Sequence, residues 1–166
     1  MMPLPVDRPA RRLAYRALLL ALALLLSYVE HLVPLSLALP GMKVGLPNAV
    51  IMYAFFHLGK RCAAAISFLR VLLASLLFGS AASLFFSLLG AVFSYAVLLL
   101  LSYAPLGRIG LSIGCAAAHG AGQILAAAVL YGTAVFSYLP YMLLAALPFG
   151  ALCGLLLYMC ERLLPW

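Results

Sequence analysis

A series of apolar segments fills the chain and restricts the folds open to it. Hydrophobic residues make up 68% of the 166 residues, and charged residues make up 8%. In a lipid bilayer each backbone N–H and C=O must be paired within the protein, and a helix does this within one segment. None of the segments shows the alternation of a membrane barrel strand. The sequence therefore predicts an all-α integral membrane protein.

The breaks between the apolar segments predict a compact bundle of six transmembrane helices. Residues 1–12 are expected to form a cytoplasmic tail, and residues 13–166 a single transmembrane domain. The second helix is short for a membrane span, and Pro47 stands near its start, where proline is tolerated. The predicted helices cover residues 13–33, 47–59, 61–78, 82–104, 110–131 and 138–164.

The basic residues predict how the chain is oriented. With the N-terminus in the cytoplasm, eight basic residues lie on the inner side and only Lys43 lies on the outer side. This distribution follows the positive-inside rule and predicts a multi-pass membrane protein with its N-terminus in the cytoplasm. It also accounts for most of the net charge of +7, so no nucleic-acid partner is expected. The inner basic residues are Arg8, Arg11, Arg12, Arg16, Lys60, Arg61, Arg108 and Arg162.

Arg70 is the one basic residue in the middle of an apolar segment, residues 62–78. A charge at that depth costs roughly 2.5–3.5 kcal/mol on insertion scales, so it is usually paired or faces a cavity. From the rise per residue, Glu30 lies about 21 Å and Arg70 about 14 Å from the inner side. An arginine side chain can bridge the difference. Arg70 is therefore expected to pair with Glu30, to bind a ligand, or to do both.

Two other regions contain candidate ligand residues. The outer connection, residues 31–48, is rich in proline and glycine and contains Lys43 and Asn48. It is either a lid over an outward-facing pocket or a surface connector whose Lys43 meets lipid headgroups. His119 and Gln123 are four residues apart on one helix face. They bind either a polar ligand group or a neighbouring helix.

Small residues recur every four positions on three of the predicted helices. Such ridges allow close approach of helix backbones in a membrane. On the fifth and sixth helices they are expected to mark contacts within the bundle. Ala17 and Ala21 form a shorter ridge on the first helix, whose face is a candidate for an intermolecular contact. The longer ridges contain Gly110, Gly114, Ala118, Gly122, Ala126, Ala146, Gly150 and Gly154.

The composition argues against catalysis by this chain alone. Asp7 is its single aspartate, and it has no D-D-x-x-D motif for magnesium and diphosphate. It also has no G-x-x-x-x-G-K-[ST] loop for ATP hydrolysis. The chain is expected to be no enzyme and to hold no metal or cofactor.

Three segments together resemble a known family. They are residues 40–48 (PGMKVGLPN), 70–79 (RVLLASLLFG) and 119–123 (HGAGQ). The chain resembles the Gx transporter family, also described as component I of heptaprenyl diphosphate synthase. That family is similar to the six-helix S components of energy-coupling-factor transporters. In those proteins an A-x-x-x-A ridge docks the coupling subunit, and Ala17 and Ala21 match it.

The resemblance implies an S component of the bacterial cell membrane that captures a small molecule from outside. Lys43 and Arg70 outweigh Glu30 in the proposed outer pocket, which favours a small anionic or amphipathic molecule. A vitamin, a flavin, a quinone or an isoprenoid precursor fits this description. The implied partners are a coupling transmembrane subunit and two ABC-type ATPases in the lipid bilayer. The alternative is a non-catalytic accessory subunit of an isoprenoid or redox enzyme system. The predicted substrate-binding residues are Glu30, Lys43, Asn48, Arg70, His119 and Gln123.

Overall fold

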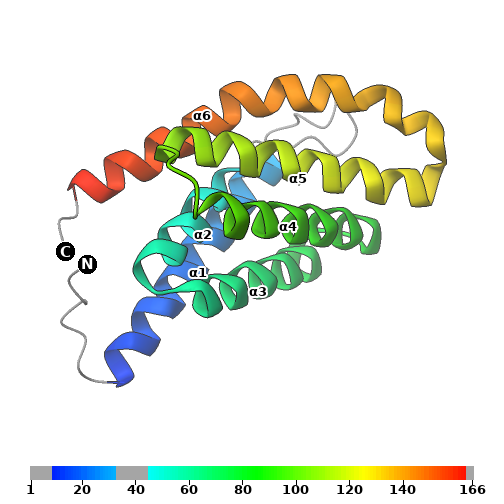
Figure 1. The fold of residues 1–166 in the computed structure, drawn as a ribbon. Coiled ribbons are helices and arrows are strands. Elements are labelled where there is room, and N and C mark those ends of the chain that lie inside the picture. The colour runs from blue at the N-terminus through cyan, green and yellow to red at the C-terminus, as the bar shows by residue number, and fades with distance from the viewer. Residues whose placement is uncertain (1–8, 33–44, 164–166) are drawn as a thin grey trace.

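The computed structural model describes residues 9–32 and 45–163 (Figure 1). All regular elements in these residues are helical, which confirms the all-α prediction. The helices are α1 (Pro9–Leu32), α2 (Leu46–His57), α3 (Lys60–Phe78), α4 (Ala81–Leu101), α5 (Arg108–Tyr131) and α6 (Leu139–Leu163), with the 3-10 helix η2 (Thr133–Tyr138) before α6.

Five helices are long and apolar enough to cross a membrane: α1, α3, α4, α5 and the stretch from η2 through α6. Large apolar side chains such as Leu76 (72% exposed) and Leu100 (71% exposed) cover the helix surfaces. Such a surface suits lipid better than water. The short helix α2 does not meet the length of a span. Its 12 residues measure about 18 Å, against the roughly 30 Å of a bilayer core. The described residues thus contain the six predicted helices, five of which reach the length of a span, with α2 as the shorter sixth.

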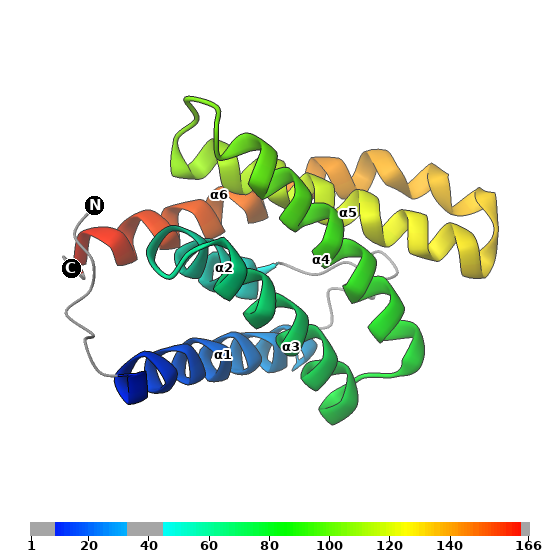
Figure 2. The same cartoon turned by 60° about the horizontal axis from the view of Figure 1, so that its bottom comes forward.

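Two groups of three helices make up the bundle (Figures 1 and 2). The most extensive contacts join α4 to α5 and α5 to α6, while α1, α2 and α3 contact one another. The groups meet where α3 packs on α4 and α2 packs on α6. Helix α2 is enclosed by these neighbours, and each residue from Val50 to Phe55 is buried. Its contacts with three neighbouring helices therefore place α2 in the protein core, not at the lipid surface.

Glycines bring α5 against both of its neighbours. A Cβ atom built on Gly122 would lie 2.7 Å from the carbonyl oxygen of Leu89 on α4. On α6, a Cβ atom at Gly154 would lie 2.6 Å from the Cα atom of Ile109. These contacts confirm the predicted small-residue ridges at these positions. Gly110 differs, since its nearest neighbour would be a Leu106 side-chain carbon at 3.9 Å.

Candidate functional site

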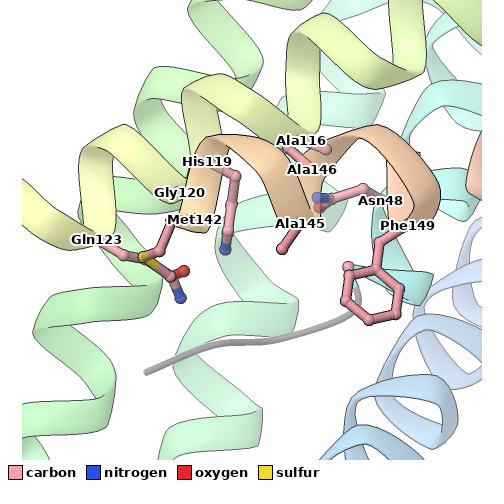
Figure 3. A pocket seen from close by; sticks show the side chains of 10 residues that line it. Asn48, Ala116, His119, Gly120, Gln123, Met142, Ala145, Ala146 and Phe149 are labelled. Carbon is pink, nitrogen blue, oxygen red and sulfur yellow. The ribbon is translucent and has the colours of Figure 1, made fainter. Parts of the chain in front are cut away.

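A small cavity lies between α2, α5 and α6, and its wall combines three polar side chains with glycine and apolar residues (Figure 3). Its volume is about 30 Å³, which is room for about two water molecules. Three of the predicted ligand residues share its wall: Asn48, His119 and Gln123. The complete lining is Gly45, Asn48, Ala116, His119, Gly120, Gln123, Met142, Ala145, Ala146 and Phe149.

Local structure explains how these polar side chains reach the cavity. Gly45 has φ 83°, a left-handed conformation that suits glycine, and its carbonyl accepts a hydrogen bond from Asn48 N at 2.9 Å. This turn starts α2 and places Asn48 in its first turn. On α5, His119 and Gln123 are one turn apart and are only 7% and 4% exposed. Gly90 on α4 makes room for the imidazole, because a Cβ atom there would lie 2.8 Å from His119 Cε1.

A second cavity extends the polar interior toward α3. Asn48 lines it too, together with the hydroxyl-bearing Ser67 of α3 and Ser94 of α4. Its volume is about 10 Å³, close to that of one water molecule. Polar side chains therefore continue from His119 and Gln123 on α5, past Asn48, to the face of α3 that carries Ser67. Arg70 follows Ser67 by three residues and so lies on the same face of that helix.

Arg70 is buried, with 6% of its surface exposed. Its Nε and Nη2 atoms have no hydrogen-bond partner among the described residues. The predicted ion pair with Glu30 is not formed in this part of the chain, although the Glu30 carboxylate acts on Arg70 electrostatically. The depths estimated from the sequence suggested that the Arg70 side chain could reach Glu30. In the structure the two side chains attract each other without forming an ion pair. Arg70 is also absent from the wall of the α2–α5–α6 cavity.

Glu30 instead contacts the start of α2. Its Oε1 atom accepts a hydrogen bond from Leu46 N at 2.6 Å. The first N–H groups of a helix have no partner within the helix, and its N-terminal end favours negative charge. From α6, Cys153 Sγ donates to the Gly45 carbonyl at 3.4 Å. Glu30 and Cys153 therefore fix the first turn of α2, and with it Asn48.

Gln123, like Arg70, has a buried hydrogen-bond donor, Nε2, without a partner among the described residues. A buried donor without an acceptor costs about 1–3 kcal/mol, and more if charged. Buried polar groups in proteins are nearly always paired, so such groups need an explanation. Arg70 and Gln123 offer donors that an anionic or oxygen-rich ligand group would satisfy.

The family described as heptaprenyl diphosphate synthase component I matches residues 19–160. The chain belongs to this family. The match spans the whole cavity lining and also Glu30 and Arg70, and it confirms the family resemblance seen in the sequence. No curated protein and no solved structure matched the chain.

The other predicted site residues of this family member lie away from the cavity. Ala17 and Ala21 are exposed on α1, and Ala17 precedes the residues that match the family. Lys43 lies outside the described residues, as does most of the connection expected to form a lid. Sequence reasoning missed Met142, Ala145 and Phe149, which complete the cavity from α6. Apolar side chains in an apolar helix give no sequence signal for such a role.

Proposed function

We propose that this chain is a non-catalytic membrane subunit of a prenyl diphosphate synthase system and binds an anionic amphipathic molecule within its helix bundle. The buried Arg70, with two donors that meet no acceptor among the described residues, carries this proposal. Membership in the family described as heptaprenyl diphosphate synthase component I supports the prenyl diphosphate part of the proposal. The composition supports a non-catalytic role, since the sequence contains one aspartate and two glutamates.

The chemistry of the buried donors suits phosphate oxygens. A guanidinium is planar, always charged and able to donate two parallel hydrogen bonds to a phosphate. The amides of Gln123 and Asn48 add uncharged donors along the polar interior. The cavity holds only about 30 Å³ in this state, so binding has to widen it. The α6 wall, formed by Met142 and Ala145, is the boundary whose displacement would enlarge it.

Such a subunit would hold an isoprenoid diphosphate at the membrane for a separate catalytic protein. An isoprenoid diphosphate combines an apolar chain with a strongly charged group, so it partitions between bilayer and water. A membrane subunit that binds the charged group would keep the intermediate near the enzyme. The chemistry of chain elongation, with its magnesium ions, would stay on the partner.

A second candidate is the substrate-binding S component of an importer. The ridge on α1 favours it, because Ala17 and Ala21 are both exposed on that helix. Small residues at a lipid-facing surface permit close approach of another membrane helix. In this candidate the partners are a coupling subunit and two ATPases.

Co-purification of the full chain from its native membrane separates the two candidates. The accessory-subunit proposal predicts that a prenyltransferase is retained, and the importer candidate predicts ATPases. Direct binding of farnesyl diphosphate to the purified chain tests the ligand class. Retention of ATPases without a prenyltransferase, together with no farnesyl diphosphate binding, would reject the first proposal in favour of the second.

A further inference from the structure

A separate groove runs between α1 and α3. Its volume is about 700 Å³, and it shares no lining residue with the α2–α5–α6 cavity described above. Small and apolar side chains form its walls, including Ala17 and Leu20 from α1 and Ala65, Ile66 and Leu69 from α3. The groove is thus largely apolar and lies on a surface that five long apolar helices mark as lipid-facing.

Three cations lie in this groove: Arg16, Lys60 and Arg61. Lys60 Nζ donates to the Tyr103 hydroxyl at 2.7 Å and lies 4.5 Å from the centre of the same ring. Arg16 and Arg61 are exposed, and neither makes an ion pair with a described residue. Their charge is therefore available to an anion.

The acidic residues of the described chain are used elsewhere. Glu161 receives a hydrogen bond from Arg108 Nε at 2.9 Å and also lies 3.5 Å from His57 Nε2. Glu30 receives the Leu46 N–H at the start of α2. Neither glutamate lines the groove. Three positive charges thus stand beside an apolar channel with no carboxylate from the described residues to neutralise them.

The order of the side chains along α3 matches the order of parts in a phospholipid. Lys60 and Arg61 begin the helix, and Leu69 lies eight residues further along, about 12 Å beyond Arg61. A lipid with its phosphate at the start of α3 would lay its acyl chain along Ala65 and Leu69. Basic pockets between transmembrane helices bind such headgroups.

We propose that this groove is a specific site for a lipid whose headgroup carries two phosphodiesters, as in cardiolipin. A single phosphodiester would neutralise one of the three positive charges, and two phosphodiesters neutralise two. Two phosphates can also contact both helices at once, one at Arg16 on α1 and the other at Arg61 on α3. A docked protein would not require basic residues at one end of the groove and apolar residues along the rest. A lipid requires this order, so it matches the groove better. This lipid site does not rest on the proposed ligand binding in the bundle, and it includes Ala17 of the α1 ridge in its wall.

Native mass spectrometry of the full chain in mild detergent tests this site. Cardiolipin and phosphatidylglycerol are titrated in separate experiments, and the bound lipid is counted. The wild-type chain should retain one cardiolipin with clear preference over phosphatidylglycerol. The double variant Arg16→Gln/Arg61→Gln should bind cardiolipin about thirtyfold more weakly, since each basic residue near a membrane surface contributes about 1 kcal/mol and about 1.4 kcal/mol is a tenfold change.

Two further variants keep the test decisive. Arg11→Gln/Arg162→Gln removes the same amount of charge from residues outside the groove lining and should leave the cardiolipin affinity unchanged. Ala65→Trp keeps all three cations and fills the groove, so it should also abolish cardiolipin retention. Equal binding of the two lipids, equal losses in both double variants, or full retention by Ala65→Trp would overturn the proposal. So would loss of a co-purified protein in Ala65→Trp with unchanged lipid binding. Thermal unfolding of each variant verifies that it is folded.

Discussion

Replacement of Arg70 by methionine tests whether this buried cation serves a ligand or the fold. Methionine fills a similar length of side chain without a charge. Because Arg70 is 6% exposed and makes no ion pair within the described chain, its charge is a cost to the unliganded protein. Replacing a whole buried ion pair by apolar side chains is often neutral or stabilising by about 1–4 kcal/mol, and a buried charge without an ion-pair partner is costlier still. Arg70→Met should therefore have an unchanged or higher melting temperature without ligand.

Ligand affinity should change in the opposite direction. A hydrogen bond to a charged group contributes about 1.5–3 kcal/mol, which corresponds to about tenfold to 150-fold in the dissociation constant. Binding of farnesyl diphosphate to the purified chain, measured by isothermal titration calorimetry, should weaken by that factor in Arg70→Met. Gln123→Leu should weaken it less, because an uncharged amide donor is lost.

A double-mutant cycle with Glu30→Gln provides the control. Glutamine keeps an oxygen that can accept the Leu46 N–H, so this variant should lose less than about 1 kcal/mol of folding free energy. Because the Glu30 carboxylate attracts Arg70 without forming an ion pair, the coupling energy between Arg70→Met and Glu30→Gln should be favourable but below about 1 kcal/mol. Lower stability of Arg70→Met, strong coupling to Glu30 and unchanged affinity would together refute the ligand role and restore the structural ion pair.

Three other predictions follow from the helix surfaces. Gly154→Ala should lower the free energy of unfolding by about 1–3 kcal/mol, because its Cβ atom meets α5 backbone at 2.6 Å; Gly110→Ala, with no neighbour nearer than 3.9 Å, should be neutral or stabilising in the same melting experiment. Ala17→Leu/Ala21→Leu should leave melting unchanged, since both residues are exposed, and should abolish co-purification of the membrane partner; a misfolded variant would show that the ridge packs internally. A cysteine introduced at the exposed Lys60 should react with an impermeant thiol reagent only from the cytoplasmic side, and labelling from outside would reverse the predicted orientation.

The helices were predictable from sequence because apolar runs and glycine breaks act locally. The helices predicted over residues 47–59 and 61–78 are present as Leu46–His57 and Lys60–Phe78, and Gly59 between them has φ 94°, which favours glycine. The spacing of four residues also predicted that His119 and Gln123 share one face of their helix, and both line the same cavity. The role of Glu30 was not predictable in this way. Its acceptor contact with Leu46 joins residues 16 positions apart, and it depends on how far α2 extends toward α1.

The incomplete length of α2 also bears on how the protein is inserted into a membrane. A segment of 12 residues is too short to be recognised as a span by its own hydrophobicity. Helices α1 and α3 can enter the bilayer independently, and α2 has to be carried in between them. Its contacts with α1 and α3 can form first, and those with α6, near the end of the chain, complete its burial. The α2–α5–α6 cavity therefore forms late in biogenesis, so a chain interrupted before α6 would be inserted but would have no binding site.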